Sequence, residues 1–353
     1  MKARTTIPLL ALSIAAACVA TPAAAQAQSG NSNWVAPRTP EGQPDLQGNW
    51  TNATVTPFER PSGVGPVMSA EEVAAIREAA ETRAQSLTRP SDPNRPAPPV
   101  GGDGSTGAAG GVGGYDGIYI DRGDAVAVVR GEARTSLVTF PADGRVPATT
   151  EASRAERLEY GRSSRAGGAY DHPENRPLGE RCIMSFGSNA GPPMLPNGFY
   201  NNNYTIVQTA DHVVIMTEMI HDTRIIRIGD GPRLPPDVRP WMGDSWGRWE
   251  GDTLVVETTN LHPMQRFRSN SSDNLKVIER FTREDEDTIV YHFTIDDPSV
   301  YAEPWGGEVP LESMGNELIY EYACHEGNYA LSNILSGARY QERQAAQNQS
   351  EPR

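Results

Sequence analysis

The sequence predicts an all-β protein, either an antiparallel β-barrel or a β-sandwich, with a few peripheral helices. Three observations predict this class. About ten short runs rich in β-branched or aromatic residues follow one another, tight-turn residues separate several of them, and few helical patterns lie between them. The clearest stretch is 204–260, which has the pattern of four successive strands.

The first 25 residues have the pattern of a signal peptide. Lys2 and Arg4 precede a short apolar run at 7–19, and alanines at 23–25 supply the small residues that a signal peptidase accepts. The run is shorter than the roughly 20 residues that a membrane-spanning helix needs. We therefore expect a secreted or periplasmic protein without a membrane span.

The net charge and the absence of certain motifs limit the kinds of ligand and partner that we expect. The formal net charge is −14, and losing Lys2 and Arg4 would make it −16, so nucleic acid is not an expected partner. The glycine-rich runs have the wrong spacing for a phosphate-binding loop, and no HExxH motif is present. The histidines are scattered along the chain. No cofactor and no metal site are expected, and a small-molecule ligand or substrate is the expected partner.

Residues 26–114 are predicted to form an extended arm, a short helix and a flexible linker. The helix is expected over 68–84, where Ser69 and Glu72 have the spacing of a capping box. Residues 90–114 are rich in Pro, Gly and Ser and hold too little apolar surface to fold by themselves. The β-domain is expected over 115–344, followed by a disordered tail at 345–353.

Within the β-domain, turn residues divide the strands. Ala210–His212 and Glu250–Asp252 are predicted hairpin turns, and Gly251 suits a positive φ. The irregular, proline-rich stretch 170–198 is expected to be a loop that covers a barrel mouth. The other expected strands are 45–50, 115–121, 125–130, 135–140, 275–283, 288–296 and 318–324, and the expected helices are 151–165 and 328–344.

Two cysteines, Cys182 and Cys324, remain in the mature chain. In an oxidising compartment they can close one disulfide, which would span a long loop. The alternative is a pair of buried thiols.

Charged residues inside the predicted strands are the candidate site. His221 titrates near neutral pH, and Glu218 or Asp222 would orient it for acid–base catalysis. Arg224, Trp246, Arg248 and Glu250 are the candidate ligand-binding residues. The alternative interpretation is that these charges form surface ion pairs worth about 0–1 kcal/mol each. The GDSWG stretch at 243–247 is not expected to be a nucleophile elbow, because no helix pattern follows Ser245.

Several stretches resemble a large group of secreted bacterial proteins of unknown function. They are GQPDLQGNW, VQTADHVVIMTEMIHDTRIIRI, MGDSWGRWEGDTLVVETTN, IERFTREDEDTIVYHFTIDDP and YEYACHEGN. The resemblance implies a secreted module and supplies no activity or catalytic residues. By fold analogy alone, the strand series is also similar to a lipocalin-like barrel.

Three function classes follow from these observations. The first is a barrel that binds a small, partly apolar molecule through aromatic contacts and an arginine. The second is an acid–base hydrolase, lyase or isomerase that uses the His221 cluster. The third is a cell-envelope interaction module without a cavity. Burial of Glu218, His221, Arg224 and Arg248 in one cavity would favour the first two classes, and their dispersal in solvent would favour the third.

Overall fold

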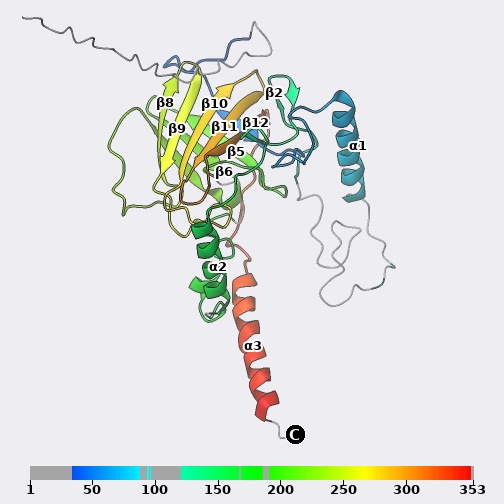
Figure 1. The fold of residues 1–353 in the computed structure, drawn as a ribbon, viewed down its shortest axis with the longest axis vertical. Coiled ribbons are helices and arrows are strands. Elements are labelled where there is room, and N and C mark those ends of the chain that lie inside the picture. Colours follow the sequence, from blue (N-terminus) through cyan, green and yellow to red (C-terminus); the bar gives the residue numbers. More distant parts are fainter. Residues whose placement is uncertain are drawn as a thin grey trace, which may run out of the picture.

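A closed barrel of nine strands forms the centre of the molecule, seen in a computed structural model that describes residues 34–87, 94, 96, 121–166, 168–185 and 191–350 (Figure 1). The all-β barrel with few peripheral helices is therefore confirmed. The predicted signal peptide, the strand at 115–120, nearly all of the linker and the last three residues lie outside the described residues.

The barrel strands neighbour one another nearly in chain order, and pairing of the last strand with the first closes the ring. Every pair is antiparallel except β7–β8, because the connection 229–243 returns the chain along the barrel before β8 begins. The strands are β1 (Gly48–Thr51), β5 (Asn203–Gln208), β6 (His212–Thr217), β7 (Thr223–Ile228), β8 (Asp244–Glu250), β9 (Thr253–Thr259), β10 (Lys276–Arg283), β11 (Thr288–Asp296) and β12 (Trp305–Ser313).

The two ends of the barrel are built differently. At one end, which we call the turn end, hairpins turn within residues 209–211, 251–252 and 284–287. At the other end, the loop end, the connections are 218–222, 260–275 and 297–304. The predicted turns at 210–212 and 250–252 agree with the structure to within a residue or two. Gly251 has φ +61°, as its turn requires.

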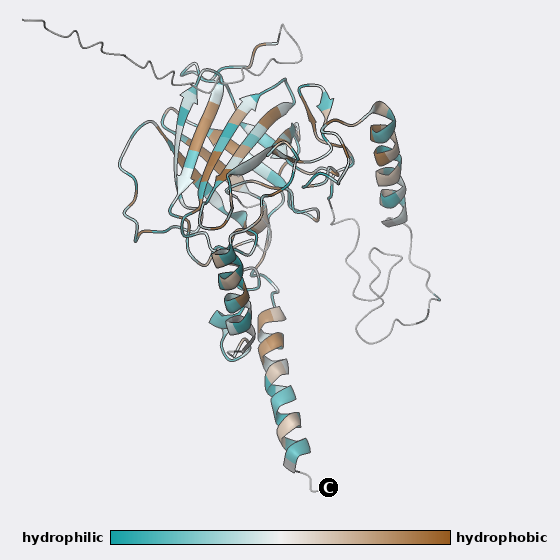
Figure 2. Ribbon diagram, viewed as in Figure 1, coloured by the Kyte–Doolittle hydropathy of each residue, from teal (hydrophilic) through white to brown (hydrophobic). Residues whose placement is uncertain are grey.

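The barrel interior is filled with side chains. Buried, inward-facing residues alternate with partly buried ones along strands such as β6 and β10, as period-2 strands require (Figure 2). Trp305, Tyr204, Tyr291, Phe281 and Phe293 are essentially inaccessible to solvent and form one core with the aliphatic residues around them. Tyr291 and Trp305 are therefore core residues and not ligand contacts in an open barrel.

Short elements and three helices surround the barrel. At the start of α1 (Ala70–Leu87), the Ser69 N–H donates to Glu72 Oε2 at 2.7 Å and the Glu72 N–H donates to Ser69 Oγ at 3.2 Å, so the predicted capping box is confirmed. Helices α2 (Glu151–Ala166) and α3 (Ala330–Ser350) extend from the same side of the barrel (Figure 1). The remaining elements are β2 (Val128–Val129), β3 (Glu132–Ala133), β4 (Val138–Phe140), η2 (Pro173–Asn175) and η3 (Met219–His221).

Two sequence predictions near the C-terminus are wrong, and one strand there was not predicted. Residues 318–324 form no strand, and the final strand is β12, whose glycines and Pro310 concealed it. In β12, Gly306 and Gly307 pair with β4 while Glu312 and Ser313 pair with β1. Pro310 lies between the part of β12 that pairs with β4 and the part that pairs with β1. No described strand faces Pro310 on that side, so its lack of an N–H costs no hydrogen bond there. The predicted tail at 345–353 is helical as far as Ser350, because its Ala- and Gln-rich sequence has good helix propensity.

Cys182 and Cys324 form a disulfide, with their Cα atoms 5.8 Å apart and a sequence separation of 142 positions. The bond ties the segment after β12 to the loop that follows η2. Among the described helices, none has the length and apolar character to cross a membrane.

Candidate functional site

The residues predicted to form one charged site occupy three separate places. The chain leaves β6 at Thr217 and re-enters a strand only at Thr223, so Glu218, His221 and Asp222 lie in a turn at the loop end. Glu218 and Asp222 therefore do not lie on a strand face with Arg224, which is in β7. Ile220 and His221 both have positive φ, 64° and 48°, which is strained for a β-branched residue.

Glu218 and Asp222 are carboxyls with restricted access to water. Burial raises the pKa of Glu218, although hydrogen bonds from Asn201 and Asn203 oppose the shift. Burial also raises the pKa of Asp222, to about 6, against the opposing field of His221. Asp222 Oδ2 is buried and meets no hydrogen-bond partner among the described residues. The turn therefore holds two carboxyls that protonate more readily than usual.

His221 itself is exposed, and its Nδ1 lies 3.1 Å from the Tyr322 carbonyl oxygen. The imidazole is thus engaged by the segment that precedes Cys324, not by Glu218. The predicted arrangement, with a carboxylate orienting His221 inside the barrel, is not formed.

Arg224 points into the barrel and is fully buried against Glu279. Two hydrogen bonds of 2.5 and 2.9 Å join the guanidinium to the carboxylate. Burial disfavours the charge on Arg224, but the field and hydrogen bonds of Glu279 outweigh that effect, and the pKa of Arg224 is raised. Tyr291 Oη donates to Glu279 Oε1 and accepts from the Met194 N–H. This network closes the barrel interior beneath the loop end.

Arg248 and Glu250 lie on the outer surface of the barrel. Glu250 accepts from Arg248 on the same strand and from Arg280 on β10, and all three side chains are exposed. Trp246 shares this outer face and packs against the Arg227 guanidinium, 4.3 Å from the ring centroid. Side chains along a strand point alternately into and out of the barrel. Arg248, Glu250 and Trp246 point outward, whereas Arg224 points inward, so the barrel wall separates them. For Arg248 and Glu250, the surface-pair alternative is correct.

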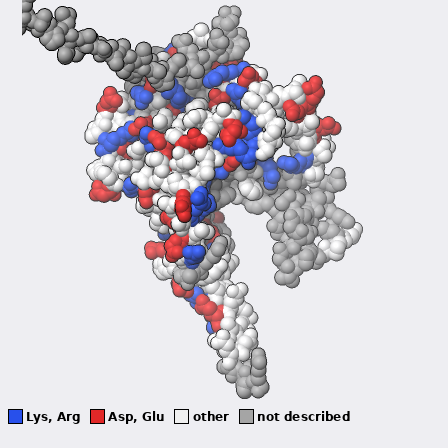
Figure 3. All heavy atoms as spheres, viewed as in Figure 1, with Lys and Arg blue, Asp and Glu red and all other residues white. Residues whose placement is uncertain are grey.

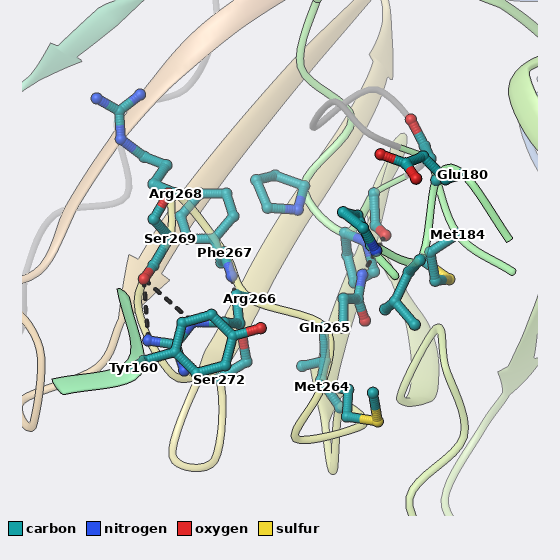
Figure 4. A pocket seen from close by; sticks show the side chains of 18 residues that line it. Tyr160, Glu180, Met184, Met264, Gln265, Arg266, Phe267, Arg268, Ser269 and Ser272 are labelled. Carbon is teal, nitrogen blue, oxygen red and sulfur yellow. Dashed lines mark hydrogen bonds between the residues drawn. The ribbon is translucent and has the colours of Figure 1, made fainter. Parts of the chain in front are cut away.

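A pocket of about 660 Å³, which we call the α2 pocket, lies at the loop end (Figure 4). Its walls are Tyr160 from α2, residues within 177–185 and 191–193, and the β9–β10 connection at 261–272. The apolar part of the lining is Leu178, Met184, Leu261, Met264 and Phe267, and the polar part includes Glu180, Gln265 and Arg266. Such a mixture is typical of small-molecule sites.

Arg266 fixes one wall of the α2 pocket. Its guanidinium makes two hydrogen bonds to Glu156 of 2.9 and 2.7 Å, bonds the Ser269 carbonyl oxygen and stacks on Tyr160 at 4.0 Å. These contacts join the β9–β10 connection to α2.

The disulfide fixes the opposite wall. Cys182 lies between the lining residues Glu180 and Met184, and Asn328 donates to the Glu180 carbonyl oxygen at 3.4 Å. Ser185 Oγ contacts Met219 Sδ of the β6–β7 turn at 2.8 Å. The wall is thus attached both to the segment after β12 and to the turn that carries Asp222.

A second pocket, also about 660 Å³ and called the Phe58 pocket here, adjoins the first. Its lining is Thr54, Thr56, Phe58, Glu59, Leu137, Leu195, Pro196, Asn197, Gly198, Phe199 and Arg268. Arg268 contributes to both pockets, and in Figure 4 its side chain extends away from Glu180 and Met184. The guanidinium lies 4.7 Å from the Phe58 ring centroid.

Sequence reasoning missed these pockets. The only signal was the length and irregularity of 170–198, which was expected to cover a barrel mouth and does supply one wall of the α2 pocket. Residues 260–275 supply another wall, and this stretch carries no sequence motif that would have indicated it. Ser245, the serine of the GDSWG stretch, lies in β8 and not in a turn, and its hydroxyl is buried against Thr258.

Within the described ranges, no cluster of three or more His, Cys, Asp or Glu residues has the arrangement of a metal site. Comparisons with protein-family models, with curated proteins and with solved structures find no match. The chemistry of the loop end is therefore judged from its residues: it offers apolar volume, arginines at the walls, and two nearby carboxyls whose pKa values are raised.

Proposed function

We propose that this chain is a secreted or periplasmic β-barrel protein that binds a small, partly apolar molecule at its loop end. The observation that supports the proposal is the α2 pocket, an open pocket of about 660 Å³ that is lined by apolar side chains and a few polar ones. Because aromatic side chains fill the barrel interior, the ligand is assigned to the loop end and not to the barrel axis.

Two features of the chain support the secreted setting. The N-terminal segment has signal-peptide character, and the paired cysteines suit an oxidising compartment. The barrel face in Figure 3 carries acidic and basic residues interspersed, without a continuous basic surface on that face.

The test is to identify molecules that co-purify with the chain from its own cell envelope and to ask whether the α2 pocket holds them. Met264 lines the pocket and is half exposed, so Met264→Trp should fill the pocket with little effect on the fold. The matched control is Ile225→Trp, an exposed apolar residue on the outside of β7.

After denaturation, mass spectrometry should find a stoichiometric small molecule in the wild type and the control and at least a tenfold lower amount in Met264→Trp. Equal amounts in all three proteins would contradict binding in this pocket.

An acid–base enzyme is the second candidate, and Asp222 is the observation that favours it. Its pKa of about 6 lets the carboxyl exchange a proton near neutral pH, and its turn contacts Ser185 of the pocket wall through Met219. If the captured molecule is turned over, Asp222→Asn should lower kcat while leaving ligand capture intact. Unchanged turnover in Asp222→Asn would remove this candidate.

A further inference from the structure

Of the two arginines that line the loop-end pockets, Arg268 makes fewer hydrogen bonds through its guanidinium. An arginine side chain offers five N–H donors. Among the described residues, the only hydrogen-bond acceptor that meets its guanidinium is Glu59 Oε1, at a long 3.4 Å. Arg266, two residues earlier, bonds Glu156 twice and also the Ser269 carbonyl oxygen. Arg266 is thus held by several strong hydrogen bonds, whereas most N–H donors of Arg268 are available to a ligand.

The backbone holds Arg268 in an unusual conformation. Arg268 and Ser269 have φ values of 49° and 67°, two consecutive non-glycine residues in the left-handed region. Hydrogen bonds fix both carbonyl oxygens, since Asn270 Nδ2 donates to Arg268 O and Arg266 donates to Ser269 O. Strain held in place by surrounding contacts is a feature of ligand-binding loops.

The guanidinium also lies on an aromatic surface. The Phe58 ring centroid is 4.7 Å from Arg268 Cζ and the Trp305 centroid is 5.9 Å away. The rings restrict the plane of the guanidinium and leave its N–H edges available. About a third of the side chain is exposed. An arginine held in this way presents a preorganised fork to a planar carboxylate.

We propose that the ligand of the loop end is an amphipathic anion, whose carboxylate binds Arg268 and whose apolar part occupies the adjoining pocket space. This inference rests on the proposed function and specifies the class of ligand. The negative net charge of the chain does not oppose it, because exposed charges beyond about 8 Å are screened at physiological salt.

The experiment compares two probes of the same shape. The anion 2-naphthoate and the neutral alcohol 2-naphthalenemethanol are titrated calorimetrically into the intact chain at pH 7. The variants are Arg268→Gln and Arg268→Lys, and the control is Arg280→Gln. Arg280 is similarly exposed and ion-paired, but it lies on the outside of β10. Circular dichroism and the unfolding midpoint establish that each variant is folded.

The wild type and Arg280→Gln should bind naphthoate roughly 10- to 100-fold more tightly than the alcohol, the range expected for charge-assisted hydrogen bonds. In Arg268→Gln the two probes should bind within about twofold of each other, and Arg268→Lys should fall between because it keeps the charge and loses the fork.

Other results separate the two proposals. If both probes bind equally and Arg268→Gln changes neither, the anion inference is wrong and binding at the loop end survives. An equal loss of both probes in Arg268→Gln also overturns it, since Arg268 would then be a wall residue only. If neither probe binds the wild type, the inference and the proposed function fail together.

Discussion

The turn end and the loop end of the barrel use the same nine strands for different purposes. At the turn end, hairpins reverse within two to four residues. Phe281, Ile289 and Leu311 are fully buried beneath them, and burial raises the pKa values of the nearby Glu284 and Glu312 carboxyls. The loop end has longer connections, both pockets, a pocket wall tied by the disulfide, and a strained turn, and the Arg224–Glu279 network lies inside the barrel beneath it.

The comparison shows that the loop end contains features that lower the stability of the fold. Tight turns and an apolar core are the least costly way to close a barrel end. A buried ion pair and left-handed non-glycine residues, which are found at the loop end, each carry a free-energy cost. Such costs are commonly found at functional sites. The following predictions test this contrast, beginning with the largest expected effect.

Loss of the disulfide should affect the loop end most strongly. The Cys182→Ser/Cys324→Ser variant should lower the free energy of unfolding by about 5 kcal/mol in the chain-entropy model, because the bond closes a loop of 142 residues. Denaturant unfolding measures the change, and limited proteolysis should cut first within 314–329. The wild type under reducing conditions should match the variant. A loss below about 1 kcal/mol would show that the bond does not constrain the chain.

Breaking the internal ion pair should be nearly as costly. Glu279→Leu leaves Arg224 buried without its partner, and we expect a loss of about 3–5 kcal/mol in the free energy of unfolding. The outer pair is the matched control: Arg280→Gln should cost less than about 1 kcal/mol. Arg224→Met combined with Glu279→Leu should recover most of the loss. Equal costs for the inner and outer pairs would contradict the contrast between them.

The Asp222 carboxyl should make stability depend on pH. Because its pKa in the folded state, about 6, exceeds its ordinary value of 3.8, the stabilisation is complete below about pH 3.8 and is lost as the pH rises through 6. Asp222→Asn should therefore stabilise the protein at pH 7.5, by about 1–2 kcal/mol for a group only partly shielded from water.

Unfolding titrations of wild type and Asp222→Asn between pH 4 and 8 provide the measurement. The difference between the two should grow as the pH rises from 5 to 7. A constant difference over this range would show that Asp222 does not titrate there. Burial also raises the pKa of the neighbouring Glu218, but this residue is present in both proteins, so its titration contributes to both unfolding curves.

The smallest effect concerns the turn end. A Cβ at Gly251 meets no atom within 4 Å, but the φ of +61° makes Gly251→Ala unfavourable by about 1 kcal/mol. Gly161, inside α2, is also uncrowded and has no positive φ, so Gly161→Ala should stabilise by up to about 1 kcal/mol. Thermal unfolding compares the two variants. Changes of the same sign would mean that backbone conformation does not determine the effect.

Local patterns were sufficient to predict much of the fold. The hairpin β8–β9 follows from alternation on both sides of Gly251, and the α1 cap follows from Ser69 and Glu72. Strand β12 could not be predicted, because Gly306, Gly307 and Pro310 oppose strand formation locally. Only pairing with β1, β4 and β11 makes this segment a strand, and that pairing involves residues distant in the sequence.

The site was less predictable, for a geometric reason. Grouping Glu218, His221 and Arg224 assumed one continuous strand, and the turn at Met219–His221 separates them. Arg248 and Glu250 do share a face, but it is the outer one, and period-2 alternation alone does not tell which face is inside. Arg268 carries no local signal, because its importance comes from Phe58 and Trp305, which are remote in the sequence.

Hydrogen–deuterium exchange with and without saturating 2-naphthoate tests the central claim, binding at the loop end, most directly. Added protection should appear at 54–59, 177–185, 195–199 and 261–272, which wall the two pockets, and should be absent at the turns 209–211, 251–252 and 284–287. Protection at the turn end, or none at the loop end under saturation, would contradict the assignment of ligand binding to the loop end.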